Sequence, residues 1–175
     1  MLKPVPGAYA AELIAHGFLK YADQSKTDSL KMQLTKSFDI YDNANFKTAH
    51  IDAEELAEFS FDFFLPQLNA ILAKRNLHLS VQQIRDKQSP FAASINGDTV
   101  RLYTQDDLNN NTFWDKASRN FFKAVNRILK AQNCKEQFYL IYEGNDLQAI
   151  LLTEQQFAII AGYYRNNDKE KPYRP

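Results

Sequence analysis

The sequence predicts a single α+β domain, in which an antiparallel or mixed sheet of four to five strands is built from two β-hairpins and covered by helices. Apolar segments flank the dipeptide Asn96–Gly97 and, later, Gly144–Asn145, and dipeptides of this kind favour the tight turns of hairpins. Residues 113–131 carry apolar side chains at helical spacing on one face, which is typical of a helix that covers a sheet.

The N-terminal half is predicted to be mostly helical. Residues 8–22 and 28–36 repeat apolar side chains at helical spacing, which indicates two helices. Asp52, with Glu55 three residues later, resembles a capping box and predicts the start of a third helix. Pro66 interrupts the apolar stripe of that helix and removes a backbone donor, so we expect a kink or break there and two consecutive helices.

The C-terminal half alternates strands with helices. Residues 77–81 alternate apolar and polar side chains and predict a strand before the first hairpin. Thr112 is expected to cap the helix 113–131, and Thr153 with Gln156 predicts a capping box for a last helix. The face of helix 113–131 that is expected to be buried carries Trp114, Ala117, Phe121, Val125 and Ile128.

Length and composition bound the class of protein. A chain of 175 residues that is 45% hydrophobic fits one domain with its own core, expected to span residues 1–164. Residues 165–175 are charged and contain two prolines, which predicts a mobile tail. Cys134 is the single cysteine, no signal-peptide layout is present and no apolar run is long enough to cross a membrane. We therefore expect a cytoplasmic protein.

Motifs for metals, cofactors and catalysis are absent from the sequence. His16, His50 and His78 lie far apart, and Cys134 has no second cysteine to form a zinc pair. The five glycines form no phosphate-binding loop. We therefore expect no metal, no cofactor and no catalytic residue that the sequence alone can identify.

An enzyme remains an alternative, because groups that meet in space need not be neighbours in sequence. A pocket that gathers His50 or His78 with Asp146 or Asp106 would favour a hydrolase or a transferase. Cys134 paired with a histidine is a weaker version of the same hypothesis, since a thiol just after a helix is ordinary.

The acidic residues are the candidate partner-binding groups. Glu55, Glu58 and Asp62 are spaced i, i+3 and i+7, so they share one face of the predicted helix. Asp106 and Asp107 precede the helix 113–131 and are added to this set. A basic partner would dock on such a strip through complementary charge. The alternatives are a solvated face for the strip and, for the aspartate pair, an interaction with the positive end of the helix.

A basic stripe and an aromatic cluster are ambiguous in the sequence. The stripe follows the outer face of the helix 113–131 and comprises Arg119, Lys123, Arg127 and Lys130. A formal net charge of zero argues against nucleic-acid binding, which usually needs a basic excess. Phe59 and Phe63 fit the buried stripe of their helix, whereas Phe61 points away and is available to a partner or to a second helix.

The segment FYLIYEGNDL at 138–147, followed by LLTEQQF at 151–157, resembles the small immunity proteins of bacterial polymorphic-toxin and contact-dependent inhibition systems. Each of those proteins blocks one cognate toxin. The resemblance implies a protein that neutralises a toxin by direct binding, with the acidic residues facing a basic toxin domain. A structural or chaperone-like protein, active as a homodimer, is the second hypothesis, and the hydrolase or transferase is the third.

Overall fold

The computed structural model describes residues 5–175 and confirms the α+β class. Two separate antiparallel sheets of three strands each are present in this part of the chain. The central sheet has the order β1–β6–β5, with β1 at Thr48–His50, β5 at Gln137–Ile141 and β6 at Gln148–Leu152. The outer sheet has the order β2–β3–β4, with β2 at Val81–Gln83, β3 at Ala92–Ile95 and β4 at Asp98–Arg101.

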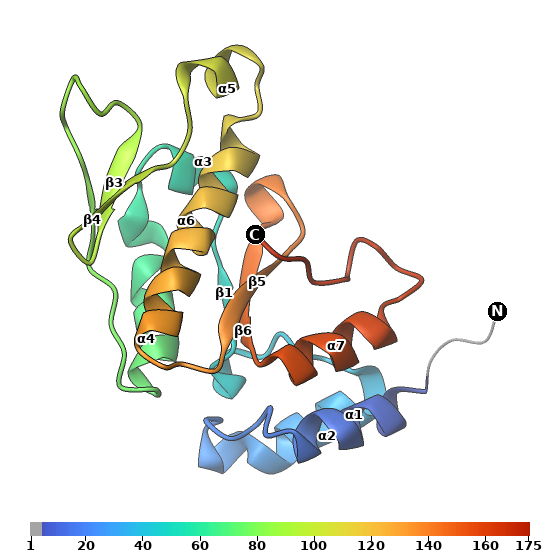
Figure 1. Cartoon of the computed structure of the whole chain (residues 1–175). Helices are drawn as coiled ribbons and strands as arrows, with labels where there is room; N and C mark the ends of the chain where they lie inside the picture. Colours follow the sequence, from blue (N-terminus) through green and yellow to red (C-terminus); the bar gives the residue numbers. More distant parts are fainter. Residues whose placement is uncertain (1–4) are drawn as a thin grey trace.

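The prediction of one sheet of four to five strands is therefore wrong. Both predicted hairpins form, but they lie apart, with the helix α6 (Phe113–Ala131) between them (Figure 1). The second hairpin gains its third strand from the N-terminal half, because β1 pairs with β6 in the register Thr48↔Ile150. The first hairpin instead pairs with β2 in the register Val81↔Ile95.

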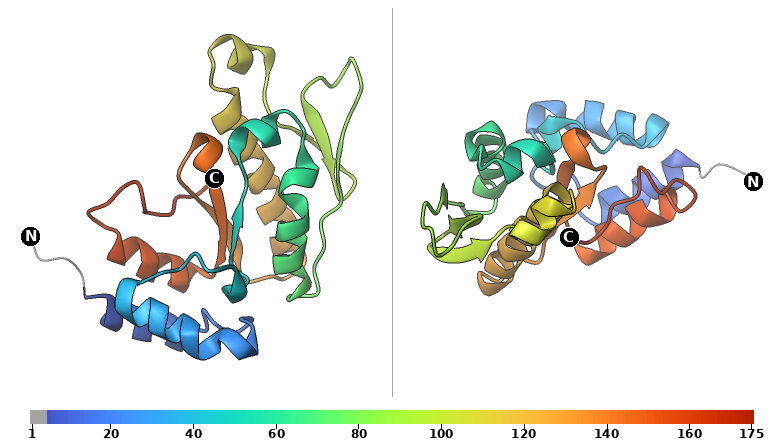
Figure 2. Two further views of the ribbon diagram at one scale, coloured as in Figure 1. Left: turned by 180° about the vertical axis from the view of Figure 1, so that it is seen from behind. Right: turned by 90° about the horizontal axis from the view of Figure 1, so that it is seen from above.

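Both faces of the central sheet are covered, so β5 and β6 are apolar along most of their length. Phe138 and Leu140 belong to the larger core, beneath α3, α4 and α6, whereas Tyr139 and Ile141 belong to a second core against α1, α2 and α7. Neighbouring strand residues point to opposite faces, and a sheet buried on both faces favours continuous apolar strands over alternating ones. The views in Figure 2 show helices on both sides of this sheet.

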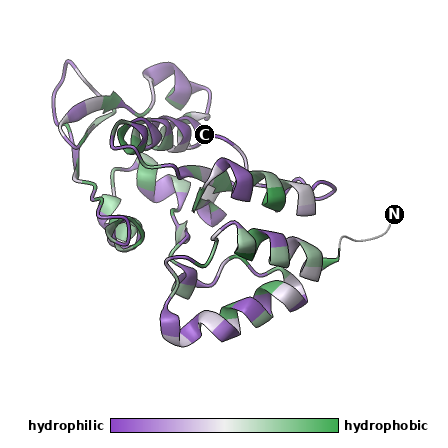
Figure 3. Cartoon of the chain, turned by 60° about the horizontal axis from the view of Figure 1, so that its bottom comes forward, coloured by the Kyte–Doolittle hydropathy of each residue, from purple (hydrophilic) through white to green (hydrophobic). Residues whose placement is uncertain are grey.

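The helices of the second core lie together at one end of the molecule, and hydrophobic and hydrophilic residues alternate around them (Figure 3). They are α1 (Pro6–Ala15), α2 (Thr27–Ser37) and α7 (Glu154–Tyr163). The capping box of Thr153 and Gln156 is confirmed at α7. Helix α1 ends earlier than predicted, because Gly17 takes a positive φ of 75° and its backbone N–H bonds the carbonyl of Ile14, the glycine stop of many helices.

The predicted third helix is broken before Pro66. Asp52 caps α3 (Ala53–Ala57) as expected, by accepting from the backbone N–H of Glu54 and of Glu55. Phe59 then takes a left-handed conformation with φ 64°, and the chain turns through the 3₁₀-helix η3 (Phe61–Phe63). Pro66 lies in the first turn of α4 (Leu65–Ala73), where a missing N–H removes no helical hydrogen bond.

The helix α6 has the predicted bounds, but its start differs in detail. The Thr112 side chain forms no cap, and its hydroxyl instead donates to the Asp107 carbonyl at 3.4 Å. Thr104 and Asp107 form a capping box for a separate short helix, α5 (Gln105–Asn109). Ala117, Phe121 and Val125 are buried as predicted, whereas Trp114 is 37% exposed. Residues 77–80 are not a strand, since β2 begins at Val81.

The segment 165–175, predicted to be a mobile tail, ends on the central sheet. Tyr173 and Leu140 exchange backbone hydrogen bonds of 2.8 and 2.9 Å as an antiparallel bridge, and Pro172 is buried. Residues 5–175 contain no helix with the length and apolar character that crossing a bilayer requires.

Candidate functional site

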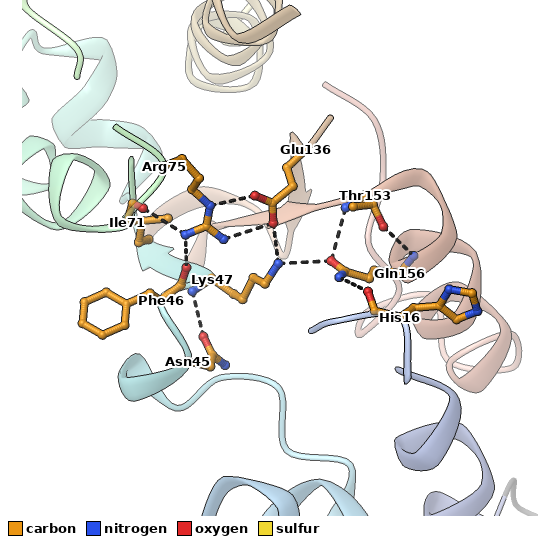
Figure 4. A network of polar contacts seen from close by, with 9 residues as sticks. All are labelled: His16, Asn45, Phe46, Lys47, Ile71, Arg75, Glu136, Thr153 and Gln156. Carbon is orange, nitrogen blue, oxygen red and sulfur yellow. Dashed lines mark hydrogen bonds and ion pairs between the residues drawn. The ribbon is translucent and has the colours of Figure 1, made fainter. Parts of the chain in front are cut away.

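The first candidate is a buried polar cluster, formed by Lys47, Arg75, Glu136 and Gln156 (Figure 4). The Glu136 carboxylate accepts from Lys47 Nζ at 2.5 Å and from Arg75 Nε at 2.7 Å and Nη2 at 3.0 Å. Lys47 Nζ also donates to Gln156 Oε1 at 3.1 Å. These residues come from four separate segments, and no sequence motif groups them.

Burial and neighbouring charges shift the pKa values of Lys47 and Glu136. Burial lowers the pKa of Lys47 to about 8, although the Glu136 carboxylate opposes this shift. Burial by itself would raise the pKa of Glu136, but hydrogen bonds and charge from Arg75 and Lys47 outweigh it and lower that pKa. These side chains are almost entirely buried and bind one another, so we assign the cluster a role in the stability of the fold.

Stability is expected to depend on Glu136 ionisation. The pKa of this carboxyl is lowered in the folded chain, so its stabilisation is present above the ordinary pKa of 4.5 and is lost as the pH falls through the lower folded pKa. The difference in urea midpoint between the wild type and Glu136→Gln should therefore shrink between pH 7 and about pH 3. A constant difference would show that the charge on Glu136 contributes nothing.

The predicted acidic strip does not lie on one continuous helix. Glu55 is on α3, Glu58 is the residue that ends it, and Asp62 lies on η3 beyond the turn at Phe59. Glu58 and Asp62 are exposed and Glu55 is half-buried. The i, i+3, i+7 geometry is therefore wrong for Asp62, although all three carboxylates remain close in the chain at the same end of the fold.

Asp106 and Asp107 have different roles. Asp107 is held by Thr104, whose side-chain and backbone hydrogen bonds lower the pKa of that carboxyl. Asp106 is exposed and is free of any ion pair among the described residues. Helix α5 connects to the end of α3 through Tyr103, whose hydroxyl donates to the Ala57 carbonyl at 3.0 Å. Asp106 is therefore an exposed charge, whereas Asp107 is a helix cap, and their role in binding a partner stays a prediction.

The structure adds further acids from distant segments to the same end. Helix α3 packs on α6 and on the 3₁₀-helix η4 (Gly144–Asp146), and Asn145 Nδ2 donates to Glu54 at 3.4 Å. A cleft of about 320 Å³ lies beside the start of α6, and Trp114, Asp115, Glu143 and Tyr173 are among its lining residues. Figures 1 and 2 show α3, α5 and the start of α6 together at one end of the molecule.

We call this region the acidic end. It comprises α3, η3, α5, η4 and the first turn of α6, and its acids are Glu54, Glu55, Glu58, Asp62, Asp106, Asp107, Asp115, Glu143 and Asp146. Within residues 5–175, Asp115 is the one acid of this set that forms an ion pair, with Arg119 at 2.8 Å. The other eight acids form no ion pair in this part of the chain, and Lys116, whose charge acts on Asp107, and Lys169, which lines a cleft with Glu143 and Asp146, offset only part of their negative charge.

Two exposed aromatic side chains accompany these acids. Phe63 is 53% exposed and Trp114 is 37% exposed. The apolar periodicity predicted regular helices that include both residues, and such helices would have buried them. Phe61, which was expected to contact either a partner or a second helix, is 5% exposed and packs against Phe64 and against Phe121 of α6, in agreement with the second alternative. Because the turn at Phe59 interrupts the helix, the residues after it face other directions than in a continuous helix, and Phe61 is buried while Phe63 is exposed.

The residues of the enzyme hypothesis meet only in part. His50 and Asp146 line one open cleft of about 430 Å³ with Tyr142 and Gln148. His50 Nε2 lies 2.7 Å from the Asn145 carbonyl, and because a carbonyl can only accept, this nitrogen is the donor. His50 and Asp146 form no hydrogen bond with each other in the part of the chain that the structure describes. His78 and Asp106 lie on other segments.

No group of three or more metal-ligating side chains occurs within residues 5–175. Comparisons with known proteins give no relative: no protein-family model, no curated protein and no solved structure matches this chain.

Proposed function

We propose that this chain binds another protein through its acidic end, and that the partner is a basic toxin domain which the chain neutralises as an immunity protein. The observation that carries the proposal is that carboxylates without an ion pair among residues 5–175 lie at the same end of the fold as the exposed side chains of Phe63 and Trp114. Interfaces commonly combine aromatic anchors, which supply most of the binding energy, with charges at the rim that steer the partner.

Direct capture is the first experiment. The chain is immobilised and exposed to a lysate of its source cells, and the bound protein is identified by mass spectrometry. The proposal expects one basic partner in stoichiometric amount. Expression of this partner alone is then expected to stop growth of a test strain, and co-expression of the chain is expected to restore it. Recovery of the chain alone would favour the enzyme alternative, which rests on the cleft shared by His50 and Asp146.

Charge reversal then tests the acidic end itself. Replacing Glu55, Glu58 and Asp62 with lysine is expected to weaken affinity for the captured partner by roughly 100-fold, because three attractions become repulsions. Most of the loss should appear as a slower association rate that depends on salt. Surface plasmon resonance at two salt concentrations measures both quantities.

The matched control reverses three acids elsewhere, with the same change in net charge. Glu12, Asp28 and Asp86 are exposed and lie on α1, on α2 and in the loop before β3. Their replacement with lysine is expected to change affinity by less than the acidic-end triple does. Equal losses from the two triples would mean that only net charge matters and would contradict a docking site at the acidic end.

A further inference from the structure

The outer sheet ends in an open strand. A two-residue turn at Asn96–Gly97, with both residues at positive φ, closes the β3–β4 hairpin at the pair Ile95↔Asp98. Residues of an antiparallel pair alternate between bonding inward and pointing outward. The Leu102 N–H bond to the Phe91 carbonyl at 2.8 Å fits the same phase. The backbone N–H and C=O groups of Asp98 and Val100, and the N–H of Leu102, thus face β3, whereas the backbone groups of Thr99 and Arg101 face away from it.

These outward groups have no hydrogen-bond partner among residues 5–175, because β4 is the last strand of the outer sheet and no turn or loop bonds the backbone of Thr99 or Arg101. An unpaired strand edge of this kind is a template on which a further strand can form. Strand β4 is short and carries the charged residues Asp98 and Arg101, which disfavours pairing with an arbitrary strand, so a strand that adds here needs a matching charge.

A groove runs along this open edge, between β4 and α6. Two adjoining clefts of about 670 and 650 Å³ form it, and both are lined by Thr99, Val100 and Arg127. Ala124 and Ile128 add apolar surface from α6. Asn120 Nδ2 donates to the Leu102 carbonyl at 2.9 Å, so α6 contacts the chain just beyond β4 and limits the groove at that end.

The charge of the groove is positive. Arg101, Lys123 and Arg127 line it, and none of them forms an ion pair in the described part of the chain. Asp98, beside the turn, is the one acid among the lining residues of the two clefts. Lys123 and Arg127 belong to the basic stripe of α6, so the outer face of this helix is one wall of the groove.

We propose that this groove binds an extended acidic segment of a partner protein, which adds to β4 as a fourth strand of the outer sheet. The free N–H and C=O groups of Thr99 and Arg101 would pair with the segment's backbone. Because the side chains of a strand alternate between its two faces, the acidic ones would all face α6 and meet Lys123 and Arg127, while the apolar ones would lie on the opposite face, beside Thr99 and Arg101. The proposal goes beyond the function proposed above and does not depend on it.

Charge separates this occupant from the other candidates. A second copy of the chain, paired edge to edge through β4, would place two sets of Arg101, Lys123 and Arg127 close together, and like charges repel. A nucleic acid would use the cations but has no peptide groups with which to pair along the strand edge. Only an acidic extended peptide uses the edge and the charge together.

The test uses defined probes with the whole chain. The probe is a fluorescent peptide of about seven residues, close to a typical strand length, in which Glu alternates with Val. A second peptide carries Lys in place of Glu, and a third is N-methylated at alternate residues and so lacks those backbone donors. Fluorescence anisotropy is expected to show binding of the first peptide, and at least about tenfold weaker binding of the other two.

Variants of the β4 edge distinguish backbone pairing from non-specific binding. Thr99→Pro removes an outward N–H without removing a bond of the sheet, because the Thr99 N–H faces away from β3. We expect it to weaken acidic-peptide binding by at least about tenfold, while Thr99→Ala, which keeps the N–H, binds normally. Circular dichroism confirms folding of both variants. Equal affinity in Thr99→Pro and Thr99→Ala would overturn strand addition.

Reversal of the groove charge gives a second line of evidence. Arg127→Glu is expected to weaken the acidic peptide and to favour the lysine peptide, whereas Lys116→Glu, on the same helix but outside both clefts, should leave both affinities unchanged. Binding of a single-stranded oligonucleotide in preference to the peptide would overturn the proposal. Concentration-dependent dimers in light scattering, lost in Thr99→Pro, would also overturn it in favour of a second copy.

Discussion

Replacing Glu136 with alanine is expected to lower the free energy of unfolding by about 3–5 kcal/mol. The Glu136 carboxylate is the shared partner of Lys47 and Arg75, whose side chains are almost entirely buried. Without it, two positive charges would face each other in a site from which water is excluded, and the cost of an uncompensated buried charge is large. Urea denaturation followed by circular dichroism measures the loss.

The matched control is Glu154→Ala. Glu154 forms an ion pair with Arg174 through side chains that are both more than half exposed, and it accepts from the Tyr139 hydroxyl at 2.9 Å. An exposed pair contributes about 0–1 kcal/mol and a hydrogen bond about 0.5–1.5 kcal/mol, so the expected loss is smaller than that from Glu136→Ala. A loss from Glu154→Ala as large as that from Glu136→Ala would show that burial is not the source of the effect. The cluster joins four segments of the chain, so its loss should destabilise the loop at Lys47, α4, β5 and α7 together.

Features that depend on nearby residues were predictable from the sequence. The turn at Asn96–Gly97, the bounds of α6 and the capping box at Thr153 all rest on local patterns, and all three are confirmed. The pairing of β1 with β6 was not predictable, because it joins segments about a hundred residues apart and β1 has only three residues. The division into two sheets follows from that pairing.

The candidate site divides in the same way. The exposure of single acids such as Glu58 and Asp106 could be read from the sequence, since charged residues stay at the surface unless they are paired. The assembly of the acidic end could not, because Glu143 and Asp146 reach it through η4, which contacts α3 only in the folded chain. The polar cluster was hidden for the same reason, as no local pattern distinguishes Lys47 from an exposed lysine.

The exchanged roles of Phe61 and Phe63 have a local cause. Helix α3 ends in the hydrogen-bond pattern that usually needs glycine: the Ser60 N–H bonds the Glu55 carbonyl at 2.8 Å, and the Phe59 N–H bonds the Leu56 carbonyl at 3.1 Å. Phe59 takes the left-handed position of this motif with φ 64°. Because glycine and asparagine are the usual residues there, the sequence showed no stop, and a continuous helix placed the wrong phenylalanine inside.

Phe61→Ala is expected to lower the free energy of unfolding by about 3–5 kcal/mol, whereas Phe63→Ala should change it by less than about 0.5 kcal/mol. Phe61 is 5% exposed, and its ring centroid lies 6.1 Å from that of Phe121 and 6.2 Å from that of Phe64. Its removal therefore leaves a cavity in the larger core. Phe63 is 53% exposed, and within residues 5–175 the aromatic ring beside it is that of His50, with the two ring centroids 5.8 Å apart.

The same pair separates folding from binding. If the acidic end is the docking site, Phe63→Ala should weaken affinity for the captured partner by about tenfold or more while the urea midpoint stays unchanged, since exposed aromatics at an interface contribute much of its energy. Two outcomes would contradict this account. Equal destabilisation by both substitutions would mean that the helix does not break at Phe59, and unchanged affinity in Phe63→Ala would leave the acidic end without an aromatic anchor at η3.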